Sequence, residues 1–240
     1  MMKKNNNKLP IVSVLMSAFN SEKTLERAID SVLNQSYKNI EFLICNDGST
    51  DSTEKILEKY ANLYDQIKII NNKNNIGLTK SLNLLIDKSK GDFIARQDAD
   101  DYSDPERLKE QIKHCINNTF QAVFTRSYNL NKNTSMQKIS YLIPYKLLAK
   151  FRNPFVHGTM LINTKIIKTL GGYDEDFYFA QDYKLYRDLI DNGVKIKKER
   201  KILYYLNTKD NISTIRKKEQ KYYANCVKNR KIPKITLYND

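Results

Sequence analysis

An α/β domain with a mostly parallel, twisted sheet flanked by helices is the fold class that this 240-residue sequence predicts. Short apolar segments alternate with amphipathic ones along the first half of the chain, as strands and helices do in such folds. Polar and acidic clusters directly follow several apolar segments, at the sheet edge where open α/β sheets bind ligands. Hydrophobic residues make up 40% of the chain, which suffices for the core of one domain and a short helical C-terminal extension.

The individual elements follow from the spacing of apolar residues. Strands are predicted at 11–16, 40–45, 67–70, 93–96, 122–128, 159–162 and 202–206. Helices are predicted at 21–33, 51–62, 78–90, 104–116, 164–170, 180–192 and 214–228. The predicted helix starts are Ser21, Asp51 with Glu54, and Asp104 before Pro105. Gly171-Gly172 and Gly193 are predicted to end two other helices.

The charge balance is strongly basic, with 41 Lys and Arg against 27 Asp and Glu and a formal net charge of +14. Such a balance indicates an anionic partner such as nucleic acid or a phospholipid surface. An AT-rich coding sequence explains it equally well, because Lys, Asn, Ile and Tyr are abundant and Trp is absent. Cys45, Cys115 and Cys226 are too dispersed for a metal knuckle and too few for a disulfide scaffold, so reduced thiols are expected.

The amino-terminal MMKKNNNK followed by IVSVLMSA imitates the basic and apolar regions of a secretory signal. The apolar run is short and β-branched and leads into an amphipathic helix, so its removal would delete the first strand. No run approaches the ~20 apolar residues of a membrane span. We therefore expect a cytoplasmic protein, bound at most peripherally to the inner face of the cytoplasmic membrane.

The strongest local signal is Asp98-Ala99-Asp100, which Asp101 follows and which a strand ending at Arg96 precedes. These charges repel one another and favour no core, so a positive group should compensate them. A Mg²⁺ or Mn²⁺ ion that bridges to a diphosphate fits, because both ions accept hard carboxylate oxygens and keep positions for phosphate. A solvated acidic turn that caps the helix after Pro105 is the alternative.

Four motifs stand in order along the chain: Ser17-Ala18-Phe19-Asn20, Asn46-Asp47-Gly48-Ser49-Thr50-Asp51, Asp98-Ala99-Asp100-Asp101, and Gly171-Gly172-Tyr173-Asp174 with Gln181-Asp182-Tyr183. In this order the chain resembles family 2 glycosyltransferases over about residues 10–215. The resemblance implies a GT-A fold and an inverting, metal-dependent transfer from a nucleotide-sugar. The expected parts are a flexible N-terminus at 1–8, a GT-A domain at 9–207 with a nucleotide-binding half (9–101) and an acceptor half (102–207), and a basic helical extension at 208–240.

For the donor, the resemblance implies that Asp47 accepts a hydrogen bond from uracil N3 of a UDP-sugar and that Phe19 lies against the base. Ser17 and Asn20, on the same loop as Phe19, would complete the pocket. A β-turn aspartate and a core aromatic are the alternatives for Asp47 and Phe19. Asn46 replaces the first Asp of the usual Asp-Asp-Gly-Ser, a departure that bears on the choice of UDP.

For the metal, the resemblance places Mn²⁺ or Mg²⁺ on Asp100 against the diphosphate, with Asp98 on the ribose or a metal-bound water. His157 matches a histidine of the family near the acceptor and phosphate region, and it is a further candidate ligand. A structural histidine is the alternative for His157.

Cations should neutralise the donor diphosphate. In the segment from Gly77 to Asn83, Leu82 occupies a place where many members of the family carry arginine. Arg96 and Lys80 are therefore the candidates.

Asp182, which follows the Gly-Gly-Tyr-Asp motif, matches the catalytic base of the family. It would take the proton from the acceptor hydroxyl as that oxygen attacks the anomeric carbon from the face opposite the nucleotide. The metal would stabilise the charge on the departing UDP, and the configuration would invert. An exposed helix residue is the alternative for Asp182.

No Gln-x-x-Arg-Trp motif follows Asp182, and the chain has no Trp. In this family that motif marks processive polymer synthases, so addition of a single hexose or N-acetylhexosamine is expected. The resemblance alone implies the acceptor, a glycan or lipid-linked hydroxyl of bacterial lipooligosaccharide, capsule or a related envelope polysaccharide. The Lys- and Tyr-rich segment from Lys195 to Lys231 is expected either to lie against an anionic membrane or to be a solvated helix that closes the site.

Three other functions are alternatives. A nucleic-acid-binding protein would use the net charge, yet the basic residues are spread over all elements and no binding motif appears, so no nucleic-acid partner is expected. A catalytically inactive homologue or subunit is opposed by the retention of Asp47, Asp98, Asp100 and Asp182. A nucleotidyltransferase would need a glycine- and arginine-rich loop where this chain has Ser-Ala-Phe-Asn.

Overall fold

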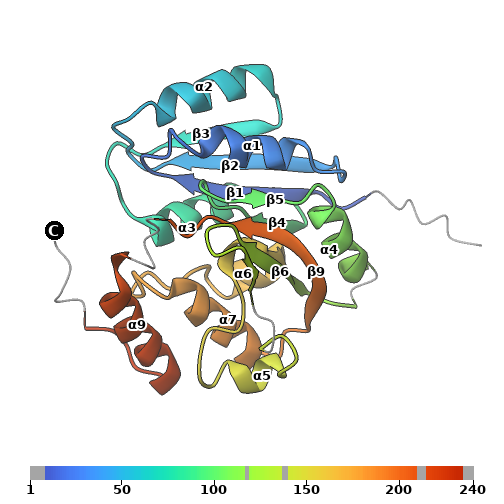
Figure 1. The fold of residues 1–240 in the computed structure, drawn as a ribbon, viewed down its shortest axis with the longest axis vertical. Coiled ribbons are helices and arrows are strands. Elements are labelled where there is room, and N and C mark those ends of the chain that lie inside the picture. Colours follow the sequence, from blue (N-terminus) through green and yellow to red (C-terminus); the bar gives the residue numbers. More distant parts are fainter. Residues whose placement is uncertain (1–8, 117–118, 137–139, 210–214, 235–240) are drawn as a thin grey trace, which may run out of the picture.

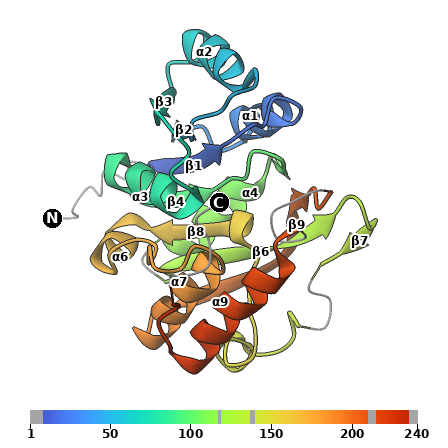
Figure 2. The ribbon, with the colours of Figure 1, turned by 90° about the vertical axis from the view of Figure 1, so that its left-hand side faces the viewer.

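A computed structural model describes residues 9–116, 119–136, 140–209 and 215–234. The predicted flexible N-terminus at 1–8 and the predicted helix start at Thr214 lie outside the described residues. The described part forms an α/β fold in which one twisted, nine-stranded sheet has helices on both faces (Figures 1 and 2), as the alternating pattern predicts.

The strands are β1 (Val12–Ala18), β2 (Ile40–Asn46), β3 (Ile67–Asn71), β4 (Phe93–Arg96), β5 (Tyr102–Ser103), β6 (Ala122–Asn129), β7 (Thr134–Ser135), β8 (Met160–Asn163) and β9 (Ile196–Leu206). The helices are α1 (Leu25–Leu33), α2 (Thr53–Leu63), α3 (Leu78–Lys88), α4 (Arg107–Cys115), α5 (Tyr145–Leu148), α6 (Thr164–Thr169), α7 (Gln181–Asp191) and α9 (Lys217–Asn229), with a 3₁₀ turn at His157–Thr159. Each predicted strand and helix has a counterpart among them. The sequence pattern missed β5, β7 and α5, which are too short to show a period.

The predicted helix starts were placed too early. Asp51 and Asp104 do accept backbone N–H groups two residues on in tight turns, from Thr53, the first residue of α2, and from Glu106, the N-cap of α4, each at 2.9 Å. Turns of this kind use the same short polar side chains as helix caps, which explains the misplacement. The observed N-caps are Thr24 for α1, Ser52 for α2 and Glu106 for α4.

The sheet has the order β3-β2-β1-β4-β8-β6-β9-β5, with β7 beside β6. The first four strands are parallel, so the carboxyl ends of β1, β2 and β4 lie at one edge. Beyond β4 the sheet is mixed, because β8 runs antiparallel to both β4 and β6 while β9 is parallel to β6. The loops that follow β1, β2 and β4 therefore lie together at this edge. Next to β4, the sheet changes from parallel to mixed.

Two hydrophobic cores lie on the two faces of the sheet. One packs α1, α2 and α4, and the other packs α3, α6 and α7. Strand β1 contributes to both, with Val14 and Met16 in the first core and Leu15 in the second, as alternating strand side chains require. This two-sided burial explains why the first strand reads as a continuous apolar run.

The C-terminal helix α9 packs against α7 through a smaller cluster that includes Tyr223, Cys226 and Val227. Figure 1 shows both helices at the end of the long axis away from α2. The cysteines 45, 115 and 226 are free and buried, as expected. Among the described helices, none has the length and apolarity to span a bilayer.

Candidate active site

The loops after β1 and β2 are tied to each other. Asn20 Oδ1 accepts the Thr50 backbone N–H at 2.9 Å, and the Asn20 N–H donates to Ser49 Oγ at 3.1 Å. Asn20 is left-handed at φ 48°, a conformation that asparagine tolerates better than most residues. The Asn20 side chain thus holds two predicted donor loops together.

Asp47, at the end of β2, is 3% exposed and links that strand to the start of α3. Its Oδ1 accepts from Asn72 Nδ2 at 2.8 Å and from the Ile76 N–H at 3.0 Å, while its Oδ2 accepts from the Gly77 N–H at 3.0 Å. A carboxylate has about four acceptor positions, so these three bonds leave one for a ligand N–H. Asp47 is therefore held rigidly and keeps capacity for one more donor.

Asn46 precedes Asp47 at the end of β2, and Phe19 follows the last residue of β1. Asn46 Oδ1 accepts the Ser49 N–H at 3.1 Å and closes the turn, a role that an aspartate would fill equally well. Asn46 thus preserves the turn that the first Asp of Asp-Asp-Gly-Ser would form. Phe19 is 45% exposed at the end of β1, so the core-aromatic alternative is wrong. Ser17 is half-buried in β1, paired in register with Cys45 of β2.

The acidic loop after β4 places the carboxylates of Asp98, Asp100 and Asp101 close to one another. Asp98 forms an ion pair with Arg96 at 2.6 Å, and this arginine is 1% exposed. Burial and the Asp98 charge raise the pKa of Asp100 to about 6. Burial, with the charges of both neighbours, also raises the pKa of Asp101, whose Oδ1 accepts the Asn207 N–H at 2.7 Å. A solvated acidic turn does not describe this loop, because its carboxylates are largely enclosed.

Two residues that the sequence pattern did not single out support this loop. Arg107 of α4 is fully buried, donates to the Arg96 carbonyl at 2.9 Å and lies 5.3 Å from the centre of the Tyr204 ring. Tyr204 of β9 accepts the Asp98 backbone N–H at 3.0 Å. Burial lowers the pKa of Arg107 to about 10, so the group stays protonated at neutral pH. No local pattern marks either residue, since both stand in ordinary helix and strand segments.

Asp182 lies in the first turn of α7, two residues after the N-cap Ala180, which has a left-handed φ of 54°. Its Oδ2 accepts from Asn153 Nδ2 at 2.6 Å and its Oδ1 from the Tyr183 N–H at 2.7 Å. Burial raises the pKa of Asp182 to about 6, and the charge of Asp98 contributes to the rise. The fold thus brings Asp182 within electrostatic reach of the acidic loop, and the exposed-helix alternative is wrong.

His157 stands beside Tyr173 of the Gly-Gly-Tyr-Asp motif, with its Nε2 at 2.7 Å from the Tyr173 hydroxyl. Burial lowers the pKa of His157 to about 3, and the nearby Arg96 adds to the effect, so the imidazole is neutral. In the part of the chain that the structure describes, no three His, Cys, Asp or Glu side chains gather as metal ligands.

The residues present still fit a divalent ion at the acidic loop. Asp98 and Asp100 offer hard oxygen donors. Burial and then the charge of Asp98 raise the Asp100 pKa, and a cation would relieve both. Mg²⁺-type sites often use only one or two carboxylates together with substrate phosphates.

The two candidate diphosphate cations differ in placement. Arg96 is enclosed, and its guanidinium is engaged by Asp98 and by the Leu15 carbonyl at 3.0 Å. Lys80 is exposed in the first turn of α3, while Leu82 is fully buried in the core. Leu82 therefore serves packing, and Arg96 compensates the charge of Asp98 in the acidic loop.

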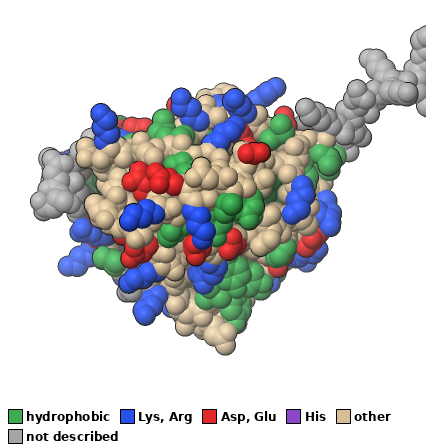
Figure 3. All heavy atoms as spheres, turned by 90° about the horizontal axis from the view of Figure 1, so that it is seen from above, with side chains coloured by type: hydrophobic (Ala, Val, Ile, Leu, Met, Phe, Trp, Pro, Cys, Tyr) green, Lys and Arg blue, Asp and Glu red, His purple; other side chains and the backbone are tan. Residues whose placement is uncertain are grey.

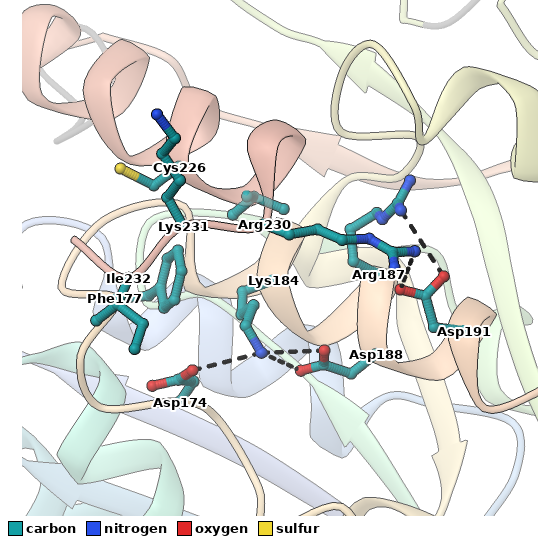
Figure 4. A pocket seen from close by; sticks show the side chains of 11 residues that line it. Asp174, Phe177, Lys184, Arg187, Asp188, Asp191, Cys226, Arg230, Lys231 and Ile232 are labelled. Carbon is teal, nitrogen blue, oxygen red and sulfur yellow. Dashed lines mark hydrogen bonds and ion pairs between the residues drawn. The ribbon is translucent and has the colours of Figure 1, made fainter.

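A cavity of about 310 Å³ lies elsewhere, between α7 and α9 (Figure 4). Its charged groups pair with each other: Lys184 with Asp188 at 2.8 Å, and Arg230 with Asp191 at 3.1 Å. On α7 these residues fall on the side opposite Asp182, given the 100° advance per residue of a helix. This cavity is thus separate from the acidic loop.

The architecture, with a mostly parallel sheet between two layers of helices, is a GT-A fold. Solved structures share the fold: Staphylococcus aureus TarS in complex with UDP-GlcNAc has a TM-score of 0.71 at 23% identity, over 83% of this chain and 59% of that one. The mannosyltransferase PcManGT of Pyrobaculum calidifontis, in complex with GDP-Man and Mn²⁺, has a TM-score of 0.75 at 16% identity, over 90% of this chain and 62% of that one.

The family profile described as glycosyl transferase family 2 matches residues 13–187, and the chain belongs to this family. EpsE of Bacillus subtilis (strain 168) is 40% identical over 167 residues, which cover 68% of this chain and 60% of EpsE. The O-antigen biosynthesis glycosyltransferase WbnJ of Escherichia coli is 30% identical over 220 residues, which cover 90% of this chain and 85% of WbnJ. The aligned part thus spans about three-fifths of the length of EpsE.

Proposed function

We propose that this chain is an inverting glycosyltransferase that moves a single hexose or N-acetylhexosamine from a UDP-sugar to a hydroxyl of a bacterial surface glycan, such as lipooligosaccharide or capsule. The observation that carries the proposal is the Asp182 carboxylate, which is held by two hydrogen bonds near Asp98 and has its pKa raised to about 6. A base with a pKa near the working pH is suited to proton transfer.

The donor assignment rests on the pocket around β1 and β2. Asp47 keeps one acceptor position, which uracil N3–H would fill, and the exposed Phe19 ring would stack on the base. Ser17 and Asn20 shape the same loop. The UDP-GlcNAc complex of a structural neighbour supports a uridine donor.

Asp100 and Asp98 would hold Mn²⁺ or Mg²⁺ with the donor diphosphate, while His157, beside the Tyr173 hydroxyl, would support the site as a structural histidine. When bound, the ion stabilises the negative charge that develops on the departing UDP. The buried Arg96 fixes the Asp98 carboxylate, and Lys80 at the start of α3 is the candidate for a phosphate contact from the solvent side.

Asp182 accepts the proton of the acceptor hydroxyl as that oxygen bonds to the anomeric carbon. The bond from that carbon to the diphosphate oxygen breaks on the opposite face, its electron pair leaves with UDP, and the anomeric configuration inverts. The hydrogen bonds from Asn153 and the Tyr183 N–H keep the carboxylate oriented during this step. Surface-glycan acceptors are supported by WbnJ, whose name places it in O-antigen biosynthesis.

The test is a thermal-shift titration with UDP, GDP, CDP and dTDP, each with Mn²⁺ and with EDTA, followed by transfer assays with the matching sugar donors. A ligand that binds only the folded state raises the melting temperature. A UDP shift that requires Mn²⁺ and subsequent sugar transfer are expected. A preference for GDP, as the PcManGT complex would suggest, would change the donor class. No shift with any nucleotide would contradict the proposal in favour of an inactive homologue.

A further inference from the structure

The basic charge of the chain is unevenly distributed. Between residues 111 and 173 the sequence contains nine Lys and Arg and no Asp or Glu. By contrast, Figure 3 shows basic and acidic side chains interspersed on the face around α1 and α2. The middle of the chain therefore supplies basic side chains without an acidic residue among them in the sequence, a distribution that favours an anionic partner.

Within this stretch, the segment that includes α5 is firmly anchored. The Tyr141 hydroxyl donates to the Phe124 carbonyl at 2.9 Å, and Lys198 Nζ donates to the Ile143 carbonyl at 2.7 Å. At the other end, the Tyr183 hydroxyl donates to the Ala149 carbonyl at 2.7 Å. The outward direction of its remaining side chains is therefore set by a fixed backbone.

Residues 142–152, which we call the 142–152 surface, present large apolar side chains to solvent. Leu142 is 78% exposed, Leu147 48% and Phe151 64%, although the neighbouring Leu148 is buried. Single exposed apolar residues are ordinary, but three within eleven residues of one anchored segment are a local concentration that calls for an explanation.

Three cations flank these apolar side chains. Lys146, Lys150 and Arg152 are all exposed, and none forms an ion pair with a described residue. Apolar side chains beside unpaired cations suit the boundary between lipid headgroups and acyl chains. A polyanion such as nucleic acid would be held by the cations and would have no use for the exposed leucines and phenylalanine.

We propose that the 142–152 surface docks on a bilayer that contains anionic phospholipid. The cations meet the negative headgroups, and the apolar side chains enter the interface between them. This inference goes beyond the proposed sugar transfer and does not depend on it.

The 142–152 surface leads, along the chain, directly into the candidate active site. Asn153, which follows Arg152 directly, donates to the Asp182 carboxylate at 2.6 Å. Figure 1 places α5 at the end of the long axis away from α2, so docking there leaves the donor loops after β1 and β2 off the membrane. Under the proposed function, this arrangement would turn Asp182, the proposed catalytic base, toward acceptors carried on lipid.

Lys195 to Lys231 is the segment expected either to lie against a membrane or to close the site, and its first part has a structural role. Residues Ile196–Leu206 form β9, which pairs with β6 in the sheet and buries Tyr204. In α9 the basic face is interrupted by Glu219, which pairs with Arg216 at 3.4 Å.

Vesicle co-sedimentation of the full chain at low salt tests the proposal. The vesicles are phosphatidylcholine alone and phosphatidylcholine with phosphatidylglycerol in equal parts. Two variants change the surface: L142S/L147S/F151S removes the apolar groups, and K146E/K150E reverses charge. Two controls make the same charge change elsewhere, K23E/K55E near α1 and α2 and K217E/K221E on α9. Thermal melts verify that each variant is folded.

Wild type is expected to partition at least about tenfold more strongly onto the anionic vesicles, and each 142–152 variant to lose at least about tenfold. Both controls should remain within about twofold of wild type. Unchanged binding by L142S/L147S/F151S would reduce the effect to charge adsorption and overturn the proposal. Loss confined to K217E/K221E would move docking to α9 and also overturn it. Self-association that only the apolar variant relieves, without vesicle binding, would instead assign the surface to a second copy of the chain.

Discussion

Two clusters of charged side chains flank α7, and they differ in whether their charges are compensated by ion pairs. In the cavity between α7 and α9, Lys184 pairs with Asp188 at 2.8 Å and Arg230 pairs with Asp191 at 3.1 Å. At the acidic loop, one ion pair is enclosed while Asp100, Asp101 and Asp182 keep pKa values raised by burial and by Asp98. The first cluster is balanced, and the second carries unrelieved negative charge.

The difference indicates which cluster has a functional role. Exposed ion pairs contribute only about 0–1 kcal/mol, so the cavity is explained as ordinary surface pairing. Enclosed carboxylates with raised pKa values cost stability, about 1.4 kcal/mol for each pKa unit before solvent screening. Such a cost is characteristic of sites where a substrate or ion completes the electrostatics.

The largest effect should come from removing the proposed base. Asp182→Asn keeps the size of the side chain but cannot accept the proton, so kcat should fall on the order of 10³-fold while UDP binding is retained. The matched change in the cavity, Asp188→Asn, should leave kcat within about twofold. Transfer assays on both variants make the comparison, and an active Asp182→Asn enzyme would refute the proposed mechanism.

Removing a proposed metal ligand should have a different signature. Asp100→Ala is expected to weaken Mn²⁺-dependent UDP binding by on the order of 10–100-fold, because it deletes a hard oxygen donor at the diphosphate. Thermal shifts with UDP, measured with Mn²⁺ and with EDTA, report the change. The exposed Asp65→Ala is the control. Equal UDP shifts in Asp100→Ala and wild type would remove Asp100 from the donor site.

Asn153 should act through Asp182 as a positioning residue. Its hydrogen bond lowers the Asp182 pKa, which burial raises, so Asn153→Ala should move the acid limb of kcat/KM to higher pH. In wild type the activity should fall below about pH 6, where Asp182 becomes protonated. We expect kcat to drop roughly tenfold, and Asn153→Gln to restore part of it. The exposed Asn225→Ala is the control, and an unmoved acid limb would exclude the positioning role.

The smallest effect concerns stability without ligand. Because the folded pKa of Asp182 is raised from 3.8 to about 6, ionisation disfavours the folded state above pH 6, and this penalty disappears as pH falls toward 4. The rise corresponds to at most about 3 kcal/mol, and partial solvent screening reduces the expected gain for Asp182→Asn to about 1–2 kcal/mol. Urea unfolding at pH 7.5 and pH 4 measures it. Asp188→Asn should show no such pH-dependent gain.

The sequence by itself predicted the α/β class and the positions of all the longer elements, because apolar spacing is a local property of the chain. It also placed Asp47 and the Asp98-Ala99-Asp100 loop at strand ends, since each follows its strand directly. The boundaries of β9 were missed, because its first half is a charged run without the alternation of a half-buried strand.

Only the tertiary structure decided which distant groups meet. Arg107, Tyr204 and Asn153 approach the acidic loop or Asp182 from other elements. The hydrogen bonds that join them span separations of 11 to 106 residues in the sequence. The protonation states of Asp100, Asp182 and His157 likewise follow from enclosure, which no local pattern encodes. Local periodicity specifies elements, whereas burial and electrostatic coupling arise when the folded sheet brings them together.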